Sequence, residues 1–392
     1  MRTLFAVVTA AMLGGCASDP LLPYTADTTP LVLFPAVDAG VRDGRARFRE
    51  IYCGVLEARR NELPDYRPCD EALTRIGREP APTGTPVDLG PSHRRLAAAV
   101  VSGLAYDCFE PWLEPPGTVT AHLAKQGYES AWVPVEGLSS SRRNALLIRD
   151  AIMGRPAEPG ARRIVLIGYS KGAPDILEAL VAYPELRQRV AAVVTVAGAV
   201  GGSALANGLE QYEANLLRHF PGARCPAGDG GAIASLRPEA RKAWLAANPL
   251  PRDVCYYSVV TFPQPDRIST ILKSYYSKLA SVDARNDSQL LFYDQVVPGS
   301  TLVGYINADH LAVAMPVART HPTVGSTLLT QNAYPREALV EAILRFVEED
   351  LGAAPSRTTS PEKSFQTTAP ASGSGCRVEG APAEIDLASP TE

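Results

Sequence analysis

Short, continuously apolar runs alternate with helical patterns along the middle of the chain. Runs without polar alternation predict buried strands at 31–34, 98–101, 131–135, 164–167, 190–196, 256–262 and 301–306. Apolar residues spaced three or four apart predict helices at 43–58, 118–126, 141–153, 173–183, 268–279 and 336–351. Strands that are apolar throughout and separated by helices are typical of a parallel sheet covered on both faces. The pattern therefore predicts an α/β fold with a mostly parallel central sheet.

Two segments depart from this alternation. Residues 201–252 are rich in Gly, Ala and Pro with only short helical pieces, so we expect a cap inserted in the sheet. Residues 353–392 are rich in Pro, Ser, Thr and Ala, which predicts a disordered tail. The remaining pattern indicates one large domain over residues 31–352, with the cap inside it.

The N-terminus has the features of a secretory signal. Arg2 precedes the apolar run 4–13, which is too short to span a bilayer as a permanent helix. The run ends in Leu13-Gly14-Gly15-Cys16, which resembles a bacterial lipobox. That resemblance implies removal of residues 1–15, a lipid-modified Cys16, a tether over 16–30 and an anchored position in the bacterial cell envelope, at the periplasmic face or the outer membrane. Ordinary signal cleavage beside an incidental cysteine is the alternative.

Composition and cysteine usage narrow the class of protein. With 46% hydrophobic and 20% charged residues, the chain can bury a large core. The net charge of −4 gives no reason to expect nucleic acid as a partner. The cysteines after Cys16 are even in number, which suggests disulfides in an exported chain, and proximity alone suggests Cys53–Cys69 and Cys225–Cys255. No Cys-x-x-Cys or His-Glu-x-x-His motif is present, so we expect neither zinc nor another cofactor.

One motif carries candidate chemistry. The strand predicted at 164–167 leads into Gly168-Tyr169-Ser170-Lys171-Gly172, and a predicted helix follows. A serine between a parallel strand and a helix needs a very tight turn, and glycines on both sides of it let the backbone make that turn. A serine hydroxyl is a poor nucleophile until a base takes its proton during attack. In this context we predict Ser170 as a nucleophile.

The order serine, acid, histidine along the chain then selects the base. Of the five histidines, two precede the serine, one lies in the predicted cap and one lies in a later loop. His310 directly follows the last predicted strand, from which a loop can reach Ser170, and we predict it as the base. For the acid we favour Asp287; Asp294 stays open as the alternative, and Asp309 is a third candidate. Whichever aspartate serves would orient the imidazole and stabilise its charged form.

These motifs together resemble a known superfamily. The serine motif, the run Asn286-Asp287-Ser288 and the ending Ala308-Asp309-His310-Leu311 are similar to the α/β-hydrolases. The likeness is greater to bacterial lipases and esterases with an Asn-Asp-Gly acid motif and an Asp/Asn-His-Leu base motif. It covers residues 96–351 and implies an α/β-hydrolase fold with a serine triad, an acyl-enzyme intermediate and an ester substrate.

The same resemblance implies donors for the oxyanion, namely the backbone amides of Lys171 and, in the run Ser102-Gly103-Leu104-Ala105, of Leu104. Two departures from the family pattern matter. Ser288 stands where the acid motif often has glycine, which keeps Asp294 in contention. Lys171 follows the nucleophile and is expected to put a cation at the mouth of the site, which counts against a strictly apolar triglyceride as substrate.

The sequence thus predicts a serine hydrolase that cleaves acyl esters, of lipids or other small molecules, at the cell envelope. A thioesterase, amidase or acyltransferase is the alternative among enzymes, because the same triad serves all of these reactions. A non-catalytic lipoprotein that binds in the envelope is an alternative from another class. The presence of serine, aspartate and histidine in the right order argues against it.

Overall fold

The computed structural model describes residues 40–77, 79–92, 96–113, 117–155, 163–208, 226 and 228–352. The predicted signal sequence, Cys16 with its tether, the strand predicted at 31–34 and the predicted tail from 353 lie outside the described residues. Across the described ranges, no helix is both long enough and apolar enough to cross a membrane.

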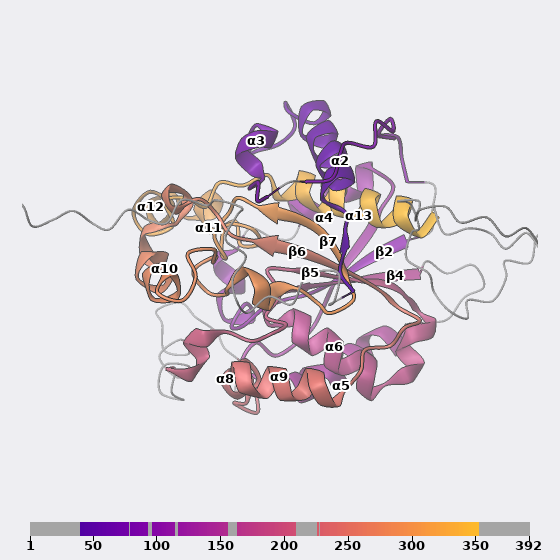
Figure 1. Cartoon of the computed structure of the whole chain (residues 1–392), viewed down its shortest axis with the longest axis vertical. Helices are drawn as coiled ribbons and strands as arrows, with labels where there is room; N and C mark the ends of the chain where they lie inside the picture. Colours follow the sequence, from indigo (N-terminus) through magenta and orange to yellow (C-terminus); the bar gives the residue numbers. More distant parts are fainter. Residues whose placement is uncertain are drawn as a thin grey trace, which may run out of the picture.

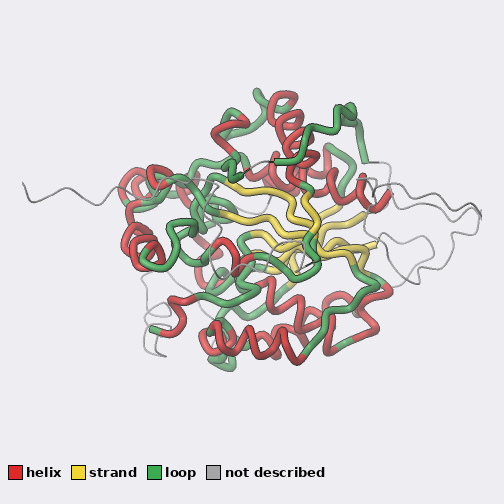
Figure 2. Tube along the Cα trace, viewed as in Figure 1, coloured by secondary structure: helices red, strands yellow, loops and turns green. Residues whose placement is uncertain are grey.

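A seven-stranded parallel sheet forms the centre of the molecule (Figures 1 and 2). In spatial order its strands are β1 (Arg42–Asp43), β7 (Thr301–Ile306), β6 (Cys255–Thr261), β5 (Val190–Val196), β4 (Arg163–Tyr169), β2 (Leu96–Val101) and β3 (Glu129–Val133). All neighbouring pairs are parallel. β2 to β7 fall on predicted apolar runs, and β5 and β6 are buried along their whole length. The predicted α/β class with a parallel sheet is therefore confirmed.

Helices cover both faces of this sheet (Figure 1). On one face lie α2 (Arg45–Ala58), α4 (Gly117–Lys125) and α13 (Arg336–Gly352), and on the other lie α5 (Ser141–Met153) and α6 (Gly172–Ala182). The apolar positions of α2 fall on the face that packs against the sheet, as the spacing predicts. The shorter helices are α3 (Cys69–Ala72), α8 (Ala232–Ser235), α9 (Pro238–Ala247), α10 (Lys273–Ala280), α11 (Val317–Thr320) and α12 (Pro322–Thr327).

The segment predicted as a cap, 201–252, contains the short 3-10 helix η3 (Ala204–Asn207), α8 and α9, while residues 209–225 and 227 lie outside the described residues. Trp244 and Leu245 of α9 pack against the apolar cluster that α5, α6 and the sheet form. This helix therefore lies on the same side of the sheet as α5 and α6 (Figure 1). Because residues 209–225 and 227 of this segment lie outside the described residues, the cap stays a prediction.

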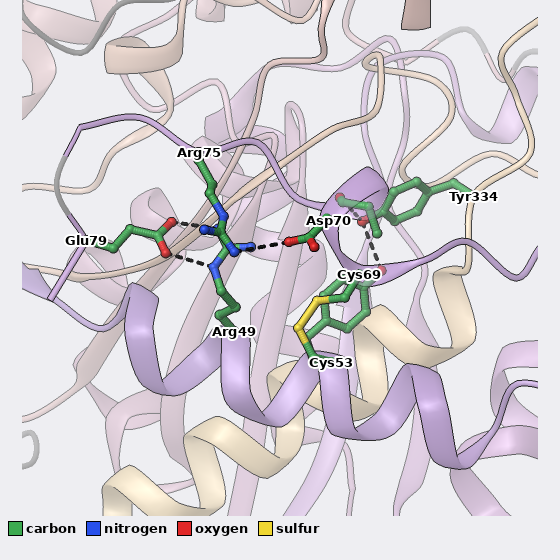
Figure 3. The surroundings of a disulfide bond; sticks show 9 residues. Arg49, Cys53, Cys69, Asp70, Arg75, Glu79 and Tyr334 are labelled. Atoms are coloured by element: carbon green, nitrogen blue, oxygen red, sulfur yellow. Dashed lines mark hydrogen bonds and ion pairs between the residues drawn. A yellow bond between two sulfur atoms is a disulfide. The ribbon is translucent and has the colours of Figure 1, made fainter. Parts of the chain in front are cut away.

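A disulfide closes the N-terminal segment. Cys53 of α2 and Cys69 of α3 are bonded, as their proximity in the sequence suggests (Figure 3). Cys108 and Cys255 also take part in disulfides. Cys225 lies outside the described residues, so its pairing with Cys255 stays a prediction.

The chain that follows this disulfide lies against the end of β7. Leu73 forms an isolated antiparallel bridge with Ile306, and the backbone N–H of Asn307 donates to the carbonyl of Ala72 at 3.0 Å. The N-terminal segment thereby holds the chain immediately before His310. Its sequence contains no motif that indicates this role.

Candidate active site

Ser170 occupies a strained turn between β4 and α6. Its φ is +52°, in the left-handed region that L-residues rarely adopt. The turn packs so closely against neighbouring backbone that only glycine fits beside the serine. A Cβ built on Gly172 would lie 2.2 Å from the carbonyl oxygen of Val101, and one on Gly103 would lie 2.8 Å from Cβ of Ser170. The glycines thus explain how the serine hydroxyl is presented at the end of the strand.

Three predicted side chains meet at this turn. Ser170 Oγ lies 2.8 Å from His310 Nε2, and His310 Nδ1 lies 2.8 Å from Asp287 Oδ2. The backbone N–H of His310 also donates to the carbonyl of Asp287 at 3.0 Å, and the hydroxyl of Tyr169 donates to the carbonyl of His310 at 2.7 Å. Ser170 is 8% exposed, His310 5% and Asp287 0%. The structure therefore forms one buried hydrogen-bonded chain from hydroxyl to carboxylate.

Asp287 is surrounded by donors. Its Oδ1 accepts the backbone N–H groups of Gln289 and Leu290 at 3.0 and 2.8 Å, and its Oδ2 accepts the hydroxyl of Thr261 at 2.6 Å. Ser288, which stands where the related motif often has glycine, has a φ of +76°. The left-handed backbone at this position explains why glycine suits it, and serine adopts the same conformation here. The departure therefore leaves the turn that carries Asp287 intact.

The other two acid candidates do not reach the imidazole. Within the described residues, the carboxyl of Asp294 forms no hydrogen bond or ion pair, and burial raises its pKa to about 7, against an opposing effect of Lys242. Asp309 accepts two backbone N–H groups, and burial raises its pKa. The structure thus brings Asp287, and neither alternative, to His310.

The backbone amides of the two predicted oxyanion donors, Leu104 and Lys171, lie in the loop after β2 and next to the serine turn. Within the described residues, neither the N–H of Leu104 nor that of Lys171 donates a hydrogen bond. Ala105, the next residue after Leu104, has a φ of +54° and donates its N–H to the carbonyl of Gly137 at 3.2 Å. That bond holds the loop after β2 in place and leaves the preceding amide unpaired, as an oxyanion donor requires.

The prediction that Lys171 places a cation at the mouth of the site is wrong. The side chain of Lys171 is 1% exposed, and its Nζ lies 2.8 Å from both carboxylate oxygens of Asp175, which is itself fully buried. Asn144 donates a further hydrogen bond to the same carboxylate at 2.7 Å. A buried ammonium needs such a partner, because an unpaired charge is costly to remove from water. Lys171 therefore does not argue against an apolar substrate.

Apolar side chains gather beside the candidate donor Leu104. They come from the loop after β5, from η3, from α8 and from the loop that carries Asp287, and comprise Ala199, Ala206, Ile233, Leu236 and Leu290. Among the described residues, no group of three or more His, Cys, Asp or Glu side chains could hold a metal ion. The cluster therefore gives the loop that carries Leu104 an apolar neighbourhood.

Comparison with known proteins identifies the family. No family model matches this chain, and no curated protein matches it. Among solved structures, it is similar to the metagenomic carboxyl esterase MGS0156, with 41% identity and a TM-score of 0.76 over 82% of this chain and 97% of that one. The chain belongs to the α/β-hydrolase superfamily of esterases and lipases. It is an enzyme that hydrolyses esters, so the non-catalytic alternative is left without support.

More distant structures resemble this esterase as well. The lipase BlEst2 of Bacillus licheniformis is 19% identical, with a TM-score of 0.45 over 62% of this chain and 95% of that one. EstA of Clostridium botulinum is 13% identical, with a TM-score of 0.46 over 76% of this chain and 97% of that one. Likeness at this level adds nothing to the assignment, which rests on the carboxyl esterase.

Two residues of the site carry no motif in the sequence. The hydroxyl of Thr261, the last residue of β6, donates a hydrogen bond to Asp287. The side chain of Gln295 accepts the backbone N–H of Thr261 and lies in the short 3-10 helix η6 (Phe292–Gln295). Their only signal is position, since the carboxyl ends of parallel strands meet where ligands bind in α/β folds. A polar residue at the carboxyl end of a buried, predominantly apolar strand, as Thr261 is, can be found in this way.

Proposed function

We propose that this esterase cleaves carboxylic esters through an acyl-enzyme intermediate on Ser170, with His310 as general base and Asp287 as the group that orients it. The observation that carries the proposal is the continuous chain of 2.8 Å contacts from Ser170 Oγ through His310 to Asp287 Oδ2. Nucleophile, base and orienting acid within hydrogen-bond reach are the arrangement that activates a serine.

In the first half-reaction, Ser170 Oγ bonds to the carbonyl carbon of the ester while His310 Nε2 takes the hydroxyl proton. The carbonyl oxygen becomes an oxyanion, and the amides of Leu104 and Lys171 donate to it. The tetrahedral intermediate then breaks its bond to the alcohol oxygen, and Nε2 returns the proton to that oxygen. The alcohol leaves, and the acyl group stays on Ser170.

In the second half-reaction, water attacks the acyl carbon and gives a proton to His310 Nε2. The bond to Ser170 Oγ breaks, Oγ takes that proton, and the carboxylic acid is released. The charge that appears on the imidazole in each half-reaction faces Asp287, whose carboxylate is held by the N–H groups of Gln289 and Leu290. Apolar residues beside Leu104 suit the hydrocarbon part of an acyl group.

Covalent labelling with a fluorophosphonate probe, together with turnover of p-nitrophenyl esters, tests this proposal. We expect wild-type protein to be labelled once, Ser170→Ala to lose both labelling and turnover, and Asp287→Asn to lose most turnover while staying folded. Asp294→Asn is the matched control and should keep its activity. Labelling that persists in Ser170→Ala, or loss of turnover in Asp294→Asn but not in Asp287→Asn, would show that the assigned residues are wrong.

The same triad could serve thioesters or amides, and the ester assignment rests on the relationship to carboxyl esterases. A panel of matched ester, thioester and amide substrates with acyl chains of rising length separates these chemistries. We expect the ester of each acyl chain to give the highest kcat/KM. An amide or thioester preferred at every chain length would overturn the assignment.

We propose, from the sequence alone, that Cys16 carries lipid and anchors the enzyme to a membrane of the bacterial envelope. Support comes from the run Leu13-Gly14-Gly15-Cys16 behind a short apolar segment. Metabolic labelling with a palmitate analogue in a bacterial host should mark the wild type and not Cys16→Ala. The variant should also move from the membrane fraction to the soluble fraction, and an unlabelled wild type would refute the anchor.

A further inference from the structure

A hydroxyl at the end of a neighbouring strand contacts the acid of the triad. Thr261 is the last residue of β6, and its Oγ1 lies 2.6 Å from Asp287 Oδ2. The same carboxylate oxygen receives His310 Nδ1 at 2.8 Å. Thr261 and Asp287 are both fully buried. One oxygen thus joins the hydroxyl to the imidazole without access for water.

Gln295 holds this threonine in place. Its Oε1 accepts the backbone N–H of Thr261 at 2.7 Å, and its Nε2 donates to the carbonyl of Thr261 at 2.8 Å. The side-chain amide therefore pairs with the backbone of Thr261 as a peptide unit of another strand would. On the other side of the strand, Thr261 is in register with Ile306 of β7. Thr261 is thus fixed from both sides.

The single proton of the threonine hydroxyl has two acceptors in reach. The Asp287 carboxylate lies at 2.6 Å, and Gln295 Oε1 lies at 3.1 Å and already accepts the N–H of Thr261. A charged acceptor at the shorter distance forms the stronger hydrogen bond. The Thr261 hydroxyl therefore donates its hydrogen bond to Asp287 Oδ2.

The hydrogen bonds of Asp287 show what this donor contributes. Oδ1 is held by two backbone N–H groups, whereas among the described residues Oδ2, the oxygen that faces His310, is bonded by the imidazole and the Thr261 hydroxyl. Without the hydroxyl, the carboxyl group can turn about the bond to its Cβ, and Oδ2 can leave the plane of the imidazole. A base that is misaligned in this way loses part of its catalytic effect even in an intact fold.

We propose that Thr261, held by Gln295, is a positioning residue of this esterase that aligns Asp287 Oδ2 with His310 Nδ1. The proposal rests on the proposed roles of Asp287 and His310. Thr261 exchanges no proton with the substrate and acts only through the orientation of the carboxylate.

Steady-state kinetics on a p-nitrophenyl ester test this role with three variants. Thr261→Val keeps the shape and removes the hydroxyl, and we expect kcat to fall about 10- to 100-fold with KM within about twofold. Thr261→Ser keeps the hydroxyl and should restore kcat to within about threefold of wild type. Thr195→Val is the matched control, because this buried threonine of β5 donates its hydroxyl at 3.5 Å to the carbonyl of Tyr257, and within the described residues it forms no hydrogen bond with Asp287 or His310.

The outcomes separate the roles. Thr261→Val with a wild-type kcat, or Thr261→Ser with a kcat as low as that of Thr261→Val, would overturn the proposal, as would an equal loss in Thr195→Val. If Thr261→Val does not fold, Thr261→Ala removes the same hydroxyl and carries the same expectation. Ser170→Ala, measured in parallel, keeps the two proposals apart. Turnover by Ser170→Ala means that the triad is wrong, whereas an inactive Ser170→Ala beside a fully active Thr261→Val refutes only the role of Thr261.

Discussion

Replacing Asp294 with asparagine should change the pH dependence of stability and leave catalysis intact. The carboxyl of Asp294 is 9% exposed and packs against Gly201, where an added Cβ would lie 2.5 Å from Oδ1. It makes no hydrogen bond within the described part of the chain, and burial raises its pKa from 3.8 to about 7. The folded protein therefore holds a proton on this group at pH values at which the unfolded chain has released it.

The sign and size of the effect follow from this difference. The pKa of Asp294 is higher in the folded protein than in the unfolded chain. Asp294 therefore does not lower the free energy of unfolding below about pH 4, and it lowers it progressively as the pH rises to about 7. The two pKa values differ by about 3, which corresponds to about 4 kcal/mol at most. Asparagine has a similar shape and no charge, so Asp294→Asn avoids this loss. We expect the variant to match wild type near pH 4 and to exceed it by on the order of 2–4 kcal/mol at pH 8.

Urea denaturation at intervals from pH 4 to pH 8.5 measures the difference between the two proteins. Asp70→Asn is the control, since Asp70 is an exposed carboxylate paired with Arg75 at the surface and should change stability by less than about 0.5 kcal/mol. A constant difference between wild type and Asp294→Asn across this range would refute the reasoning. A loss of esterase activity in Asp294→Asn would show that this carboxyl does serve the reaction.

Three further variants test the packing around the site. Cys53→Ser with Cys69→Ser should lower the free energy of unfolding by about 3 kcal/mol in urea, because the disulfide spans a separation of 16 residues; a loss below about 1 kcal/mol would contradict this. Lys171→Met should lower the free energy of unfolding by about 3–5 kcal/mol, because it leaves the buried carboxylate of Asp175 without its cation. Adding Asp175→Leu removes that carboxylate and should restore most of the lost stability. A double variant no more stable than Lys171→Met would refute the argument. Ser170→Gly should have a free energy of unfolding about 1 kcal/mol greater than Ser170→Ala in thermal unfolding, since a φ of +52° favours glycine. The reverse order would mean that the turn is unstrained.

Most of the sheet can be read from the chain because its strands are buried on both faces. β5 and β6 are buried along their whole length and predominantly apolar, so their place in the centre of a parallel sheet is visible locally. β1 pairs through two residues only and leaves no apolar run to detect. η3, α8 and α9 are short helices in a segment rich in Gly, Ala and Pro, so local periodicity does not show how they pack. Short elements and helices in biased segments therefore escape local patterns.

The candidate site divides in the same way. Ser170 is marked by its glycines, and His310 is selected by its place after the last strand. The sequence favours Asp287 and leaves Asp294 open, because both lie between the predicted helix at 268–279 and the last predicted strand. The structure separates them through a bridge between Asn286 and Leu291, which folds the loop so that Asp287 reaches the histidine.

The amino-acid sequence alone was enough to indicate the fold class and the tight serine turn, because both depend on patterns among residues close along the chain. The order of residues along the chain gave a short list of partners for the serine. The tertiary structure alone decided which aspartate faces His310, that Lys171 turns inward to Asp175, and that Thr261 contacts the acid. Ser170 and His310 are separated by 140 residues, and Thr261 and Asp287 by 26. Such contacts are set by how the strands and loops assemble, and side chains in aperiodic loops carry no local signal of their direction.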